Sequence, residues 1–352
     1  MNKDNNNEAS KPKLTPVSAL GEFGLIGHLT NRHVLQHPES VKGIGDDAAV
    51  LQPTVGKQTL ISTDMLVEGI HFDLMYTPLK HLGYKSVVVN LSDIYAMNGI
   101  PKQITVSIAL SSRFTVEALE ELYDGIYTAC RLYDIDLIGG DTTSSNKGLI
   151  ISITAIGEAD ADKVVYRNTA KVGDHLFVTG DLGGAYLGLQ LLEREKSLYL
   201  DNPNTKPEIA QHEYPVQRQL RPEARKDIIE ILADKQIVPT AMIDVSDGLS
   251  SELLHICKQS QVGCQIYEEN LPIHPKTFAL SQEFKLAPTT CALNGGEDYE
   301  LLFSVSPSDY RKLEGIHGIA SIGKVVAAEA GTKLYVSGGK SYDLVAQGWQ
   351  HL

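Results

Sequence analysis

Acidic residues beside glycine or small hydroxyl residues recur at six places in the 352-residue chain, most of them after an apolar run. The six clusters are Gly45–Asp47, Ser62–Asp64, Asn90–Asp93, Gly139–Asp141, Asp244–Gly248 and Gly295–Asp298. Small neighbours let a ligand approach the backbone, and carboxylates are the ligands that hard cations prefer. Mg²⁺ is usually held by one or two carboxylates together with substrate phosphates. The pattern therefore predicts a site that holds divalent cations against phosphates.

Two of the clusters also fit ordinary structural roles. Asp46 and Asp47 follow the turn-forming Gly43 and Gly45, so they suit a surface turn or a helix cap. Adjacent carboxylates repel each other unless a cation or a donor compensates, which favours metal binding. Ser62–Asp64 ends a predicted apolar strand, and its three oxygen-bearing side chains suit either Mg²⁺ or the N-cap of a following helix.

Asp93 is the acid whose position is hardest to explain structurally. It lies in the predicted helix 84–97, which is otherwise largely apolar, three residues after Asn90 and on the same face. A carboxylate on an apolar helix face is costly unless it is paired or binds a metal. We therefore expect Asp93 to be functional.

The remaining clusters combine acids with glycine. Gly139–Asp141 is predicted as a strand entering a diglycine turn, which exposes backbone N–H groups to phosphate or forms a simple hairpin. Asp244–Gly248 ends a strand and opens a helix, where free N–H groups favour an anion, although Asp247 alternatively only caps that helix. Gly295–Asp298 suits either a site or a tight turn with solvated acids. His71, beside Phe72, is by itself more typical of a structural residue.

The usual phosphate-binding and nucleophile motifs are missing from the sequence. Gly339-Lys340-Ser341 imitates the end of a Walker A motif, but position 334 is Leu334 where that motif requires glycine. No G-x-G-x-x-G precedes a predicted helix, and no nucleophile elbow is present. A nucleotide enzyme with this sequence would hold phosphates through several metals.

Strand-like and helix-like segments alternate in both halves, which predicts an α/β protein with mixed sheets (α+β) in two domains. The expected strands are 59–63, 104–110, 149–156, 174–179, 241–245 and 299–305. The expected helices are 22–35, 84–97, 115–133, 183–192, 222–233 and 249–258. Residues 158–172 are predicted as a connector and 197–214 as a loop or insertion. We predict a disordered tail at 1–17, an N-terminal domain at 18–160 and a C-terminal domain at 161–352.

The composition indicates which binding partners the protein lacks and in which cellular compartment it works. The net charge is −13, which argues against nucleic acid or an anionic membrane as a partner. The four cysteines form no C-x-x-C pair and suit buried thiols in a reducing compartment. No apolar run approaches the roughly 20 residues of a membrane span. Residues 1–12 lack the apolar stretch of a signal peptide, so we expect a cytoplasmic protein.

Taken in order, the motifs resemble those of the thiamine-monophosphate kinase family, from about Glu22 to the C-terminus. The segments that carry the resemblance are 22–26 (EFGLI), 43–49 (GIGDDAA), 62–72 (STDMLVEGIHF), 90–93 (NLSD), 139–142 (GGDT), 243–249 (IDVSDGL) and 295–301 (GGEDYEL). The resemblance implies a two-domain fold like that of aminoimidazole ribonucleotide synthetase. It also implies direct in-line transfer of the γ-phosphoryl group of ATP to thiamine monophosphate, several Mg²⁺ ions and a homodimer formed through the N-terminal domain.

The resemblance also assigns roles to individual residues. It implies no protein nucleophile. The implied metal positions are Asp46 (a secondary candidate), Asp47, Ser62, Thr63, Asp64, Asp93, Asp141, Asp244 and Asp247. The implied ATP contacts are Gly140, Asp141, Arg167 and Ser246, with Tyr123 on a loosely aligned helix. The implied thiamine-side contacts are His71, Glu297 and Trp349. Trp349 would stack on the cationic thiazolium ring or, alternatively, fill the C-terminal core.

Other functions stay open at this point. A related selenophosphate synthetase would carry a reactive cysteine near its start, whereas the first cysteine here is Cys130. A hydrogenase-maturation relative would end in a functional cysteine, and this chain does not. A non-catalytic Mg²⁺- or nucleotide-binding regulator would have lost a metal position, and none is missing.

Overall fold

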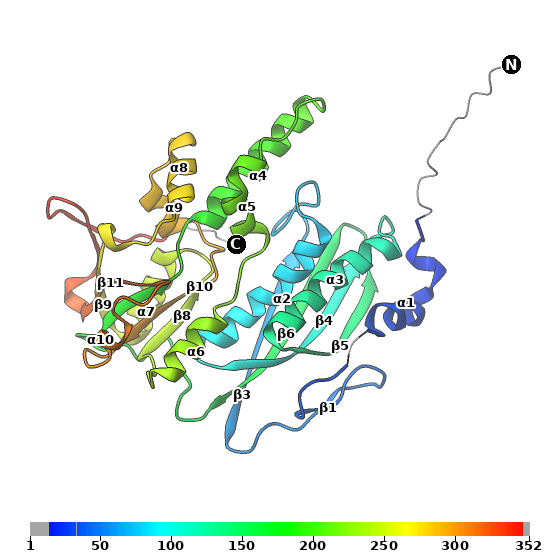
Figure 1. Cartoon of the computed structure of the whole chain (residues 1–352), viewed down its shortest axis with the longest axis horizontal. Helices are drawn as coiled ribbons and strands as arrows, with labels where there is room; N and C mark the ends of the chain where they lie inside the picture. The colour runs from blue at the N-terminus through cyan, green and yellow to red at the C-terminus, as the bar shows by residue number, and fades with distance from the viewer. Residues whose placement is uncertain (1–13, 33, 348–352) are drawn as a thin grey trace.

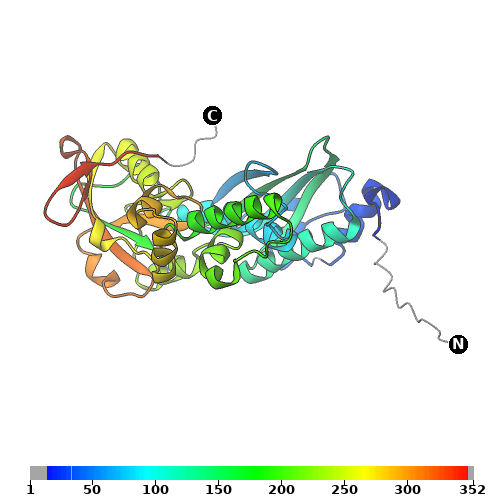
Figure 2. The same cartoon turned by 90° about the horizontal axis from the view of Figure 1, so that it is seen from above.

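A computed structural model of the protein describes residues 14–32 and 34–347. The chain forms two α/β parts that lie side by side and give the molecule an elongated outline (Figures 1 and 2). The first part is built on a four-stranded sheet and the second on a seven-stranded sheet. Both sheets are mixed, which confirms the predicted fold class.

The N-terminal sheet has the strand order β3-β6-β4-β5. These strands are β3 (Lys57–Val67), β6 (Leu149–Asp160), β4 (Ile100–Leu110) and β5 (Asp136–Ser144). β4 and β5 are parallel and are joined by helix α3 (Val116–Tyr133), while β6 pairs antiparallel with both β3 and β4. Thr115 caps α3, because its side chain accepts the N–H of Ala118.

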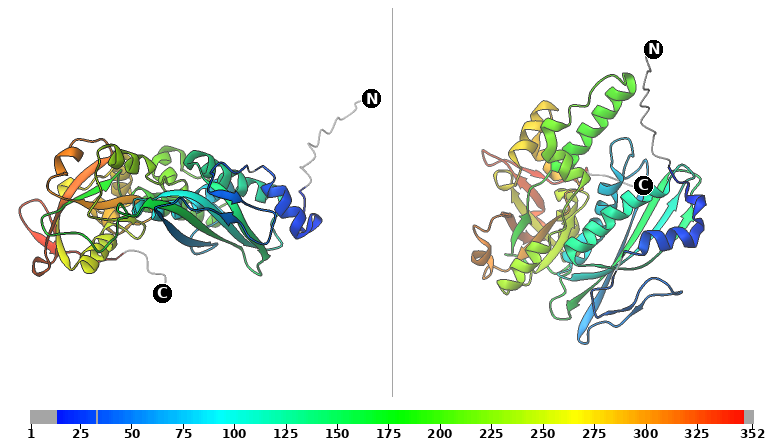
Figure 3. Two further views of the ribbon diagram at one scale, coloured as in Figure 1. Left: turned by 90° about the horizontal axis from the view of Figure 1, so that it is seen from below. Right: turned by 45° about the vertical axis from the view of Figure 1, so that its right-hand side comes forward.

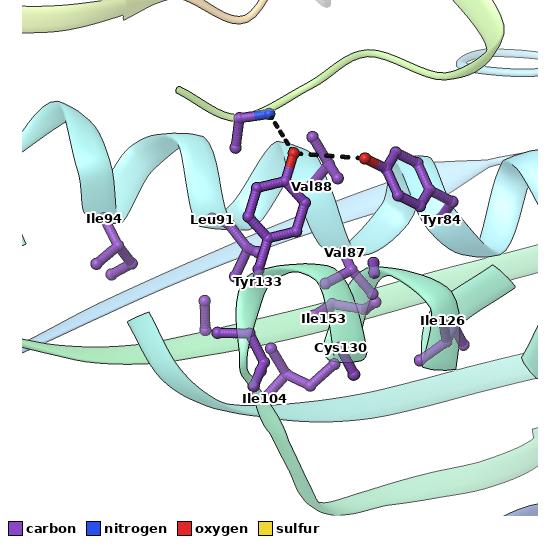
Figure 4. Packing of buried hydrophobic residues seen from close by; sticks show 14 of the residues in the cluster. Tyr84, Val87, Val88, Leu91, Ile94, Ile104, Ile126, Cys130, Tyr133 and Ile153 are labelled. Atoms are coloured by element: carbon purple, nitrogen blue, oxygen red, sulfur yellow. Dashed lines mark hydrogen bonds between the residues drawn. The ribbon is translucent and has the colours of Figure 1, made fainter. Parts of the chain in front are cut away.

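Helices α2 (Leu79–Ala96) and α3 cover one face of this sheet (Figures 1 and 3). Between them, Ile126 and Cys130 of α3 pack near Val87 and Leu91 of α2 (Figure 4). The buried hydroxyl of Tyr133 lies 3.4 Å from that of Tyr84 and accepts the N–H of Ala224 at 2.9 Å. That last bond joins the N-terminal core to the second half of the chain.

The C-terminal sheet has the order β13-β12-β9-β11-β7-β10-β8 and is antiparallel except between β12 and β9. Its strands are β7 (His175–Thr179), β8 (Ala241–Val245), β9 (Val262–Tyr267), β10 (Glu300–Val305), β11 (Ile319–Ala327), β12 (Thr332–Tyr335) and β13 (Ser341–Asp343). Its helices are α4 (Gly184–Asp201), α5 (Glu213–Leu220), α6 (Lys226–Asp234), α7 (Leu249–Ser260), α8 (Pro275–Glu283), α9 (Pro288–Asn294) and α10 (Tyr310–Leu313). α1 (Gly21–Thr30), β1 (Ser40–Lys42) and β2 (Val50–Leu51) precede the first sheet.

The hydrophobic core is continuous across the two halves. Ile228 of α6 and Phe303 of β10 belong to the same buried cluster as Leu91 of α2. The four cysteines are buried and free, as expected. In the described part of the chain, no helix is long and apolar enough to cross a membrane.

Several sequence predictions were wrong in detail. Residues 14–17, predicted as part of a disordered tail, are ordered: Thr15 donates its N–H to Glu117, and Pro16 forms a bridge to Thr115. The segment 197–214 is not a loop throughout, since α4 continues to Asp201 and α5 begins at Glu213. The helix predicted from Pro222 begins only at Lys226.

Two motifs lie inside strands that were predicted to end at them. Ser62–Asp64 lies in the middle of β3, which continues to Val67, so it neither ends a strand nor caps a helix. The diglycine Gly139-Gly140 is no turn, because β5 runs through it in a parallel ladder with β4. A Cβ at Gly140 would lie 1.9 Å from the Val106 carbonyl oxygen, so glycine is needed here for close strand packing.

Candidate active site

A cavity of about 880 Å³ opens where the two halves of the chain meet. Its walls come from β3 and the loop that follows it, from α2 and α4, from the end of β8 and the β8–α7 junction, and from the segment 286–299. Seven predicted site residues line it: Asp64, His71, Asp93, Asp244, Ser246, Asp247 and Glu297. The fold thus brings together acids that are up to 233 positions apart in the sequence (64 to 297).

One wall is the seam between β3 and α2. Ser62 donates a hydrogen bond to Asp93 at 2.5 Å, and the Asp64 N–H donates to the Asn90 side chain at 2.8 Å. Asn90 is anchored in turn, because its side-chain nitrogen donates to the Ser86 carbonyl at 2.9 Å. The sequence predicted that Asn90 and Asp93 share one helix face, and in the structure that face lies against β3.

Asp244 extends this acidic wall from the C-terminal half. It lies at the end of β8, is 4% exposed and accepts a hydrogen bond from Ser92 at 2.8 Å. Burial and the charge of Asp93 raise the pKa of Asp244 well above its ordinary value. Burial and the charge of Asp93 also raise the pKa of Asp64, to about 6. Three carboxylates from two domains thus crowd one wall with too little positive charge to compensate them.

The remaining groups on this side come from the β8–α7 junction. Asp247 does not cap α7, since Gly248 holds that position and no side chain bonds there. Instead, the Asp247 N–H donates to Glu252 at 2.9 Å, and burial raises the pKa of Glu252 to about 7. Burial is the largest effect on the pKa of Asp93 and raises it. The charge of Arg167, an exposed residue, acts in the opposite direction and lowers this pKa. Its guanidinium is therefore near the acidic wall.

The loop after β3 also lines the cavity and is held to α4. Tyr76 donates a hydrogen bond to Glu193 at 2.6 Å, and Lys196 forms an ion pair with Asp73 at 2.8 Å. His71 accepts the Val67 N–H at its Nδ1 atom at 3.0 Å, which fixes the plane of the ring. A neutral His71 therefore carries its proton on Nε2.

Glu297 enters the cavity from a short turn before β10. Its Oε2 atom accepts hydrogen bonds from Lys85 at 3.0 Å and Gln219 at 2.7 Å. The neighbouring Asp298 is not a solvated acid, because it is fully buried and accepts the N–H groups of Gly183 and Ala185 at the start of α4. The turn is thus fixed from both sides.

Eight of the predicted site residues that the structure describes do not line this cavity: Ser62 and Arg167, treated above, and six others. Asp46 and Asp47 are exposed in the segment between β1 and β2, where Asp46 pairs with Lys42. Thr63 and Asp141 lie on the opposite face of the sheet from Asp64. Residues in register on neighbouring strands share a face. Asp141 is in register with Ser107 and Ser152, whereas Asp64 is in register with the buried Ile153. Gly140 lies on β5, and Tyr123 is buried beside Tyr127 in the N-terminal core. Trp349 lies outside the described residues.

Sequence reasoning missed three buried polar residues of the site. They are Lys85, Gln219 and Glu252. Lys85, like Asp93, is a charged residue in a largely apolar helix, so the cost of burying a charge is a signal in the sequence for both. Gln219 carries no such signal, because its role depends on the packing of α5 against α2.

The fold and the cavity between its halves define a two-domain protein of the AIR synthase related class. The chain matches the family "AIR synthase related protein, N-terminal domain" over residues 45–159 and the corresponding C-terminal domain family over residues 171–333.

Individual relatives identify the family within this class. Thiamine-monophosphate kinase of Bacillus subtilis is 38% identical over 295 residues, covering 84% of this chain and 86% of the relative. The crystal structure of thiamine-monophosphate kinase from Stenotrophomonas maltophilia superposes with a TM-score of 0.76 at 32% identity, covering 92% of this chain and 98% of that one. A structure of AaThiL complexed with AMPPCP and TMP gives a TM-score of 0.72 at 33% identity, covering 95% and 98% of the two chains. The chain belongs to the thiamine-monophosphate kinase family.

Proposed function

We propose that this protein transfers the γ-phosphoryl group of ATP directly to the phosphate of thiamine monophosphate. A phosphate oxygen of thiamine monophosphate attacks the γ-phosphorus, the bond to the β–γ bridging oxygen breaks, and thiamine diphosphate and ADP are formed. The observation that carries this proposal is the interdomain cavity with its crowded carboxylates, in a member of this family. The AaThiL neighbour, complexed with AMPPCP and TMP, supports the choice of substrates.

The donors on the acidic wall fit Mg²⁺. They are hydroxyl and carboxylate oxygens, and burial without a compensating charge makes a cation favourable there. We assign Asp64, Asp93, Asp244 and Asp247, with Ser62, as the residues that would hold the ions. No three of the described His, Cys, Asp and Glu side chains lie close enough to enclose an ion by themselves. Substrate phosphates and water would complete the coordination, and the bound cations would neutralise charge between the two anionic substrates.

The other residues of the chain would orient the substrates. Arg167 would contribute a charge-assisted contact to ATP phosphates, and Ser246 a hydrogen bond next to the start of α7. His71 and Glu297 would contact the thiamine part, and Trp349 is assigned to the same part. A phosphate acceptor is already ionised near neutral pH, so the transfer requires positioning and charge neutralisation rather than a protein base.

We further propose that the protein is a homodimer joined through the uncovered face of the N-terminal sheet. Ile61 on this face is 68% exposed and Met65 is 55% exposed, although both lie in the middle of a strand. Thr63 and Asp141 lie on the same face. The metal assignments of Thr63, Asp141, Asp46 and Asp47, and the ATP assignment of Gly140, therefore depend on a second copy bringing these residues to the phosphates. Tyr123 is buried in the N-terminal core and would not be reached by ATP in this way.

The direct test is an incubation of the purified protein with ATP, Mg²⁺ and thiamine monophosphate, with thiamine diphosphate and ADP measured by chromatography. We expect equimolar formation of both products and none when Mg²⁺ is replaced by EDTA. ADP without thiamine diphosphate, or no turnover at all, would refute the kinase proposal.

A further inference from the structure

A buried lysine joins the two halves of the molecule at the cavity. Lys85 lies on α2 among buried apolar residues, and its side chain is 6% exposed. Its ammonium donates to the Gln219 carbonyl at 2.9 Å and to Glu297 Oε2 at 3.0 Å, and both acceptors belong to the C-terminal half. Burying an ammonium is costly unless it is paired and hydrogen-bonded, so these two contacts are what make Lys85 tolerable there.

Gln219 directs a second donor to the same carboxylate oxygen. Its side-chain nitrogen donates to Glu297 Oε2 at 2.7 Å, while its main-chain carbonyl accepts from Lys85. Two donors on Oε2 hold the carboxylate in one orientation and direct the lone pairs of Oε1 elsewhere. The side chain of Glu297 is 28% exposed and lines the cavity, so this orientation decides what a ligand meets.

The backbone under Glu297 is held as tightly as its side chain. Glu297 adopts φ +58°, a left-handed conformation that residues with a side chain rarely take. Its N–H donates to the Ser246 carbonyl at 2.7 Å, and a Cβ on the preceding Gly296 would lie 2.6 Å from that carbonyl oxygen. Strained backbone persists where its surroundings over-determine it, and such positions cluster at ligand sites.

We infer that Lys85 is a positioning residue: together with Gln219, it orients the Glu297 carboxylate toward the thiamine part of the substrate. The inference rests on the proposed function, because it needs Glu297 to contact thiamine monophosphate. Lys85 touches no reacting atom and acts only through Glu297. Replacing Lys85 should therefore weaken the binding of thiamine monophosphate without slowing phosphoryl transfer itself.

The test compares steady-state kinetics of Lys85→Met and Gln219→Met with the unaltered protein. We expect each variant to raise the KM for thiamine monophosphate by about tenfold, with kcat and the KM for ATP within about twofold. Gln219→Met removes a hydrogen-bond donor but no charge. A similar rise in KM in both variants would therefore show that the orientation of the Glu297 carboxylate matters, and not the positive charge of Lys85. Lys102→Met, which removes a partly buried cation paired with Glu39 at 3.4 Å, is the matched control and should change neither KM.

A double-mutant cycle makes the inference specific. In a Glu297→Ala background nothing is left to orient, so adding Lys85→Met should change the KM for thiamine monophosphate by less than about twofold. A full tenfold effect in that background, or equal losses for both substrates, would overturn the positioning role in favour of domain docking. If Lys85→Met does not fold, the same cycle with Gln219→Met decides the question. Failure of the unaltered protein to form thiamine diphosphate would instead refute the proposed function itself.

Discussion

The polar residues of α2 contact different parts of the protein on its two sides. Asn90 and Asp93 face β3, while Lys85 and Ser92, two turns apart, face the C-terminal half. The cost of burying such groups predicted that Asp93 has a partner. The identity of each partner depends on which element packs on which side of α2, and the sequence does not contain that information locally.

Replacing Asp93 tests the charge on the acidic wall. Asp93→Asn keeps the shape of the side chain and removes the charge, so we expect kcat to fall at least about tenfold at saturating Mg²⁺ with the fold intact. The measurement is the rate of thiamine diphosphate formation, with circular dichroism as the check on folding. An unchanged kcat would refute a role for Asp93 as a metal ligand.

Replacing Asp64 tests the electrostatic repulsion in the protein without metal. The pKa of Asp64 is raised to about 6, so this carboxyl is still protonated in the folded protein at pH values where the unfolded chain is already ionised. Its ionisation therefore destabilises the fold progressively from about pH 4 to pH 6, and the full cost persists above that. We expect Asp64→Asn to raise the free energy of unfolding by up to about 3 kcal/mol at pH 7.5 and by almost nothing at pH 4.

The measurement is denaturant unfolding in EDTA at both pH values. Excess Mg²⁺ with ATP should abolish the gain, because a bound cation stabilises only the protein that keeps the carboxylate. An equal gain at both pH values would show that the effect is not electrostatic.

At the scale of elements, the site depends on how closely α2 and α3 approach each other. A Cβ at Gly83 of α2 would lie 1.9 Å from the Leu122 carbonyl oxygen, and one at Gly125 of α3 would lie 1.9 Å from the Lys80 carbonyl oxygen. Two glycines facing each other's backbone set the spacing of the helix pair. The sequence predicted helices at 84–97 and 115–133, but it gave no sign that Gly83 and Gly125 are contact points.

We expect Gly125→Ala to destabilise the protein by about 3 kcal/mol, because the added methyl group meets backbone that cannot move aside. Gly27→Ala is the control, since Gly27 is exposed on α1 with nothing within 4 Å of its Cβ position. That change should be neutral or stabilise by up to about 1 kcal/mol through helix propensity. Equal effects of the two substitutions in thermal unfolding would contradict close helix packing.

At the scale of the whole molecule, the predicted metal residues on the N-terminal sheet and around the cavity fall into two groups, apart from Asp46 and Asp47 between β1 and β2. Asp64, Asp93, Asp244 and Asp247 line one cavity, whereas Thr63 and Asp141 share the uncovered face of the sheet. Neighbouring residues of a strand point to opposite faces, so Thr63 and Asp64 cannot both face the same cavity. Assembly of two copies is the proposal that gives the second group a role.

Ile61→Asp tests that assembly. A charge in the middle of the uncovered face should convert a dimer into monomers in sedimentation velocity experiments, because an unpaired carboxylate would be buried at the interface. Val55→Asp, at a turn position that is 99% exposed, should leave the oligomeric state unchanged. A dimer that survives Ile61→Asp would exclude this face as the interface.

The sequence by itself determined the alternation of strands and helices, the acids on which the site is built and the family, because periodicity, burial cost and motif order are properties of short segments. The tertiary structure alone decided that Ser62–Asp64 lies within a strand, that Gly139-Gly140 continues a parallel ladder, and that Lys85 and Gln219 hold Glu297. These outcomes depend on contacts between residues far apart in the chain. Such contacts follow from how sheets and helices pack together, and no single segment encodes them.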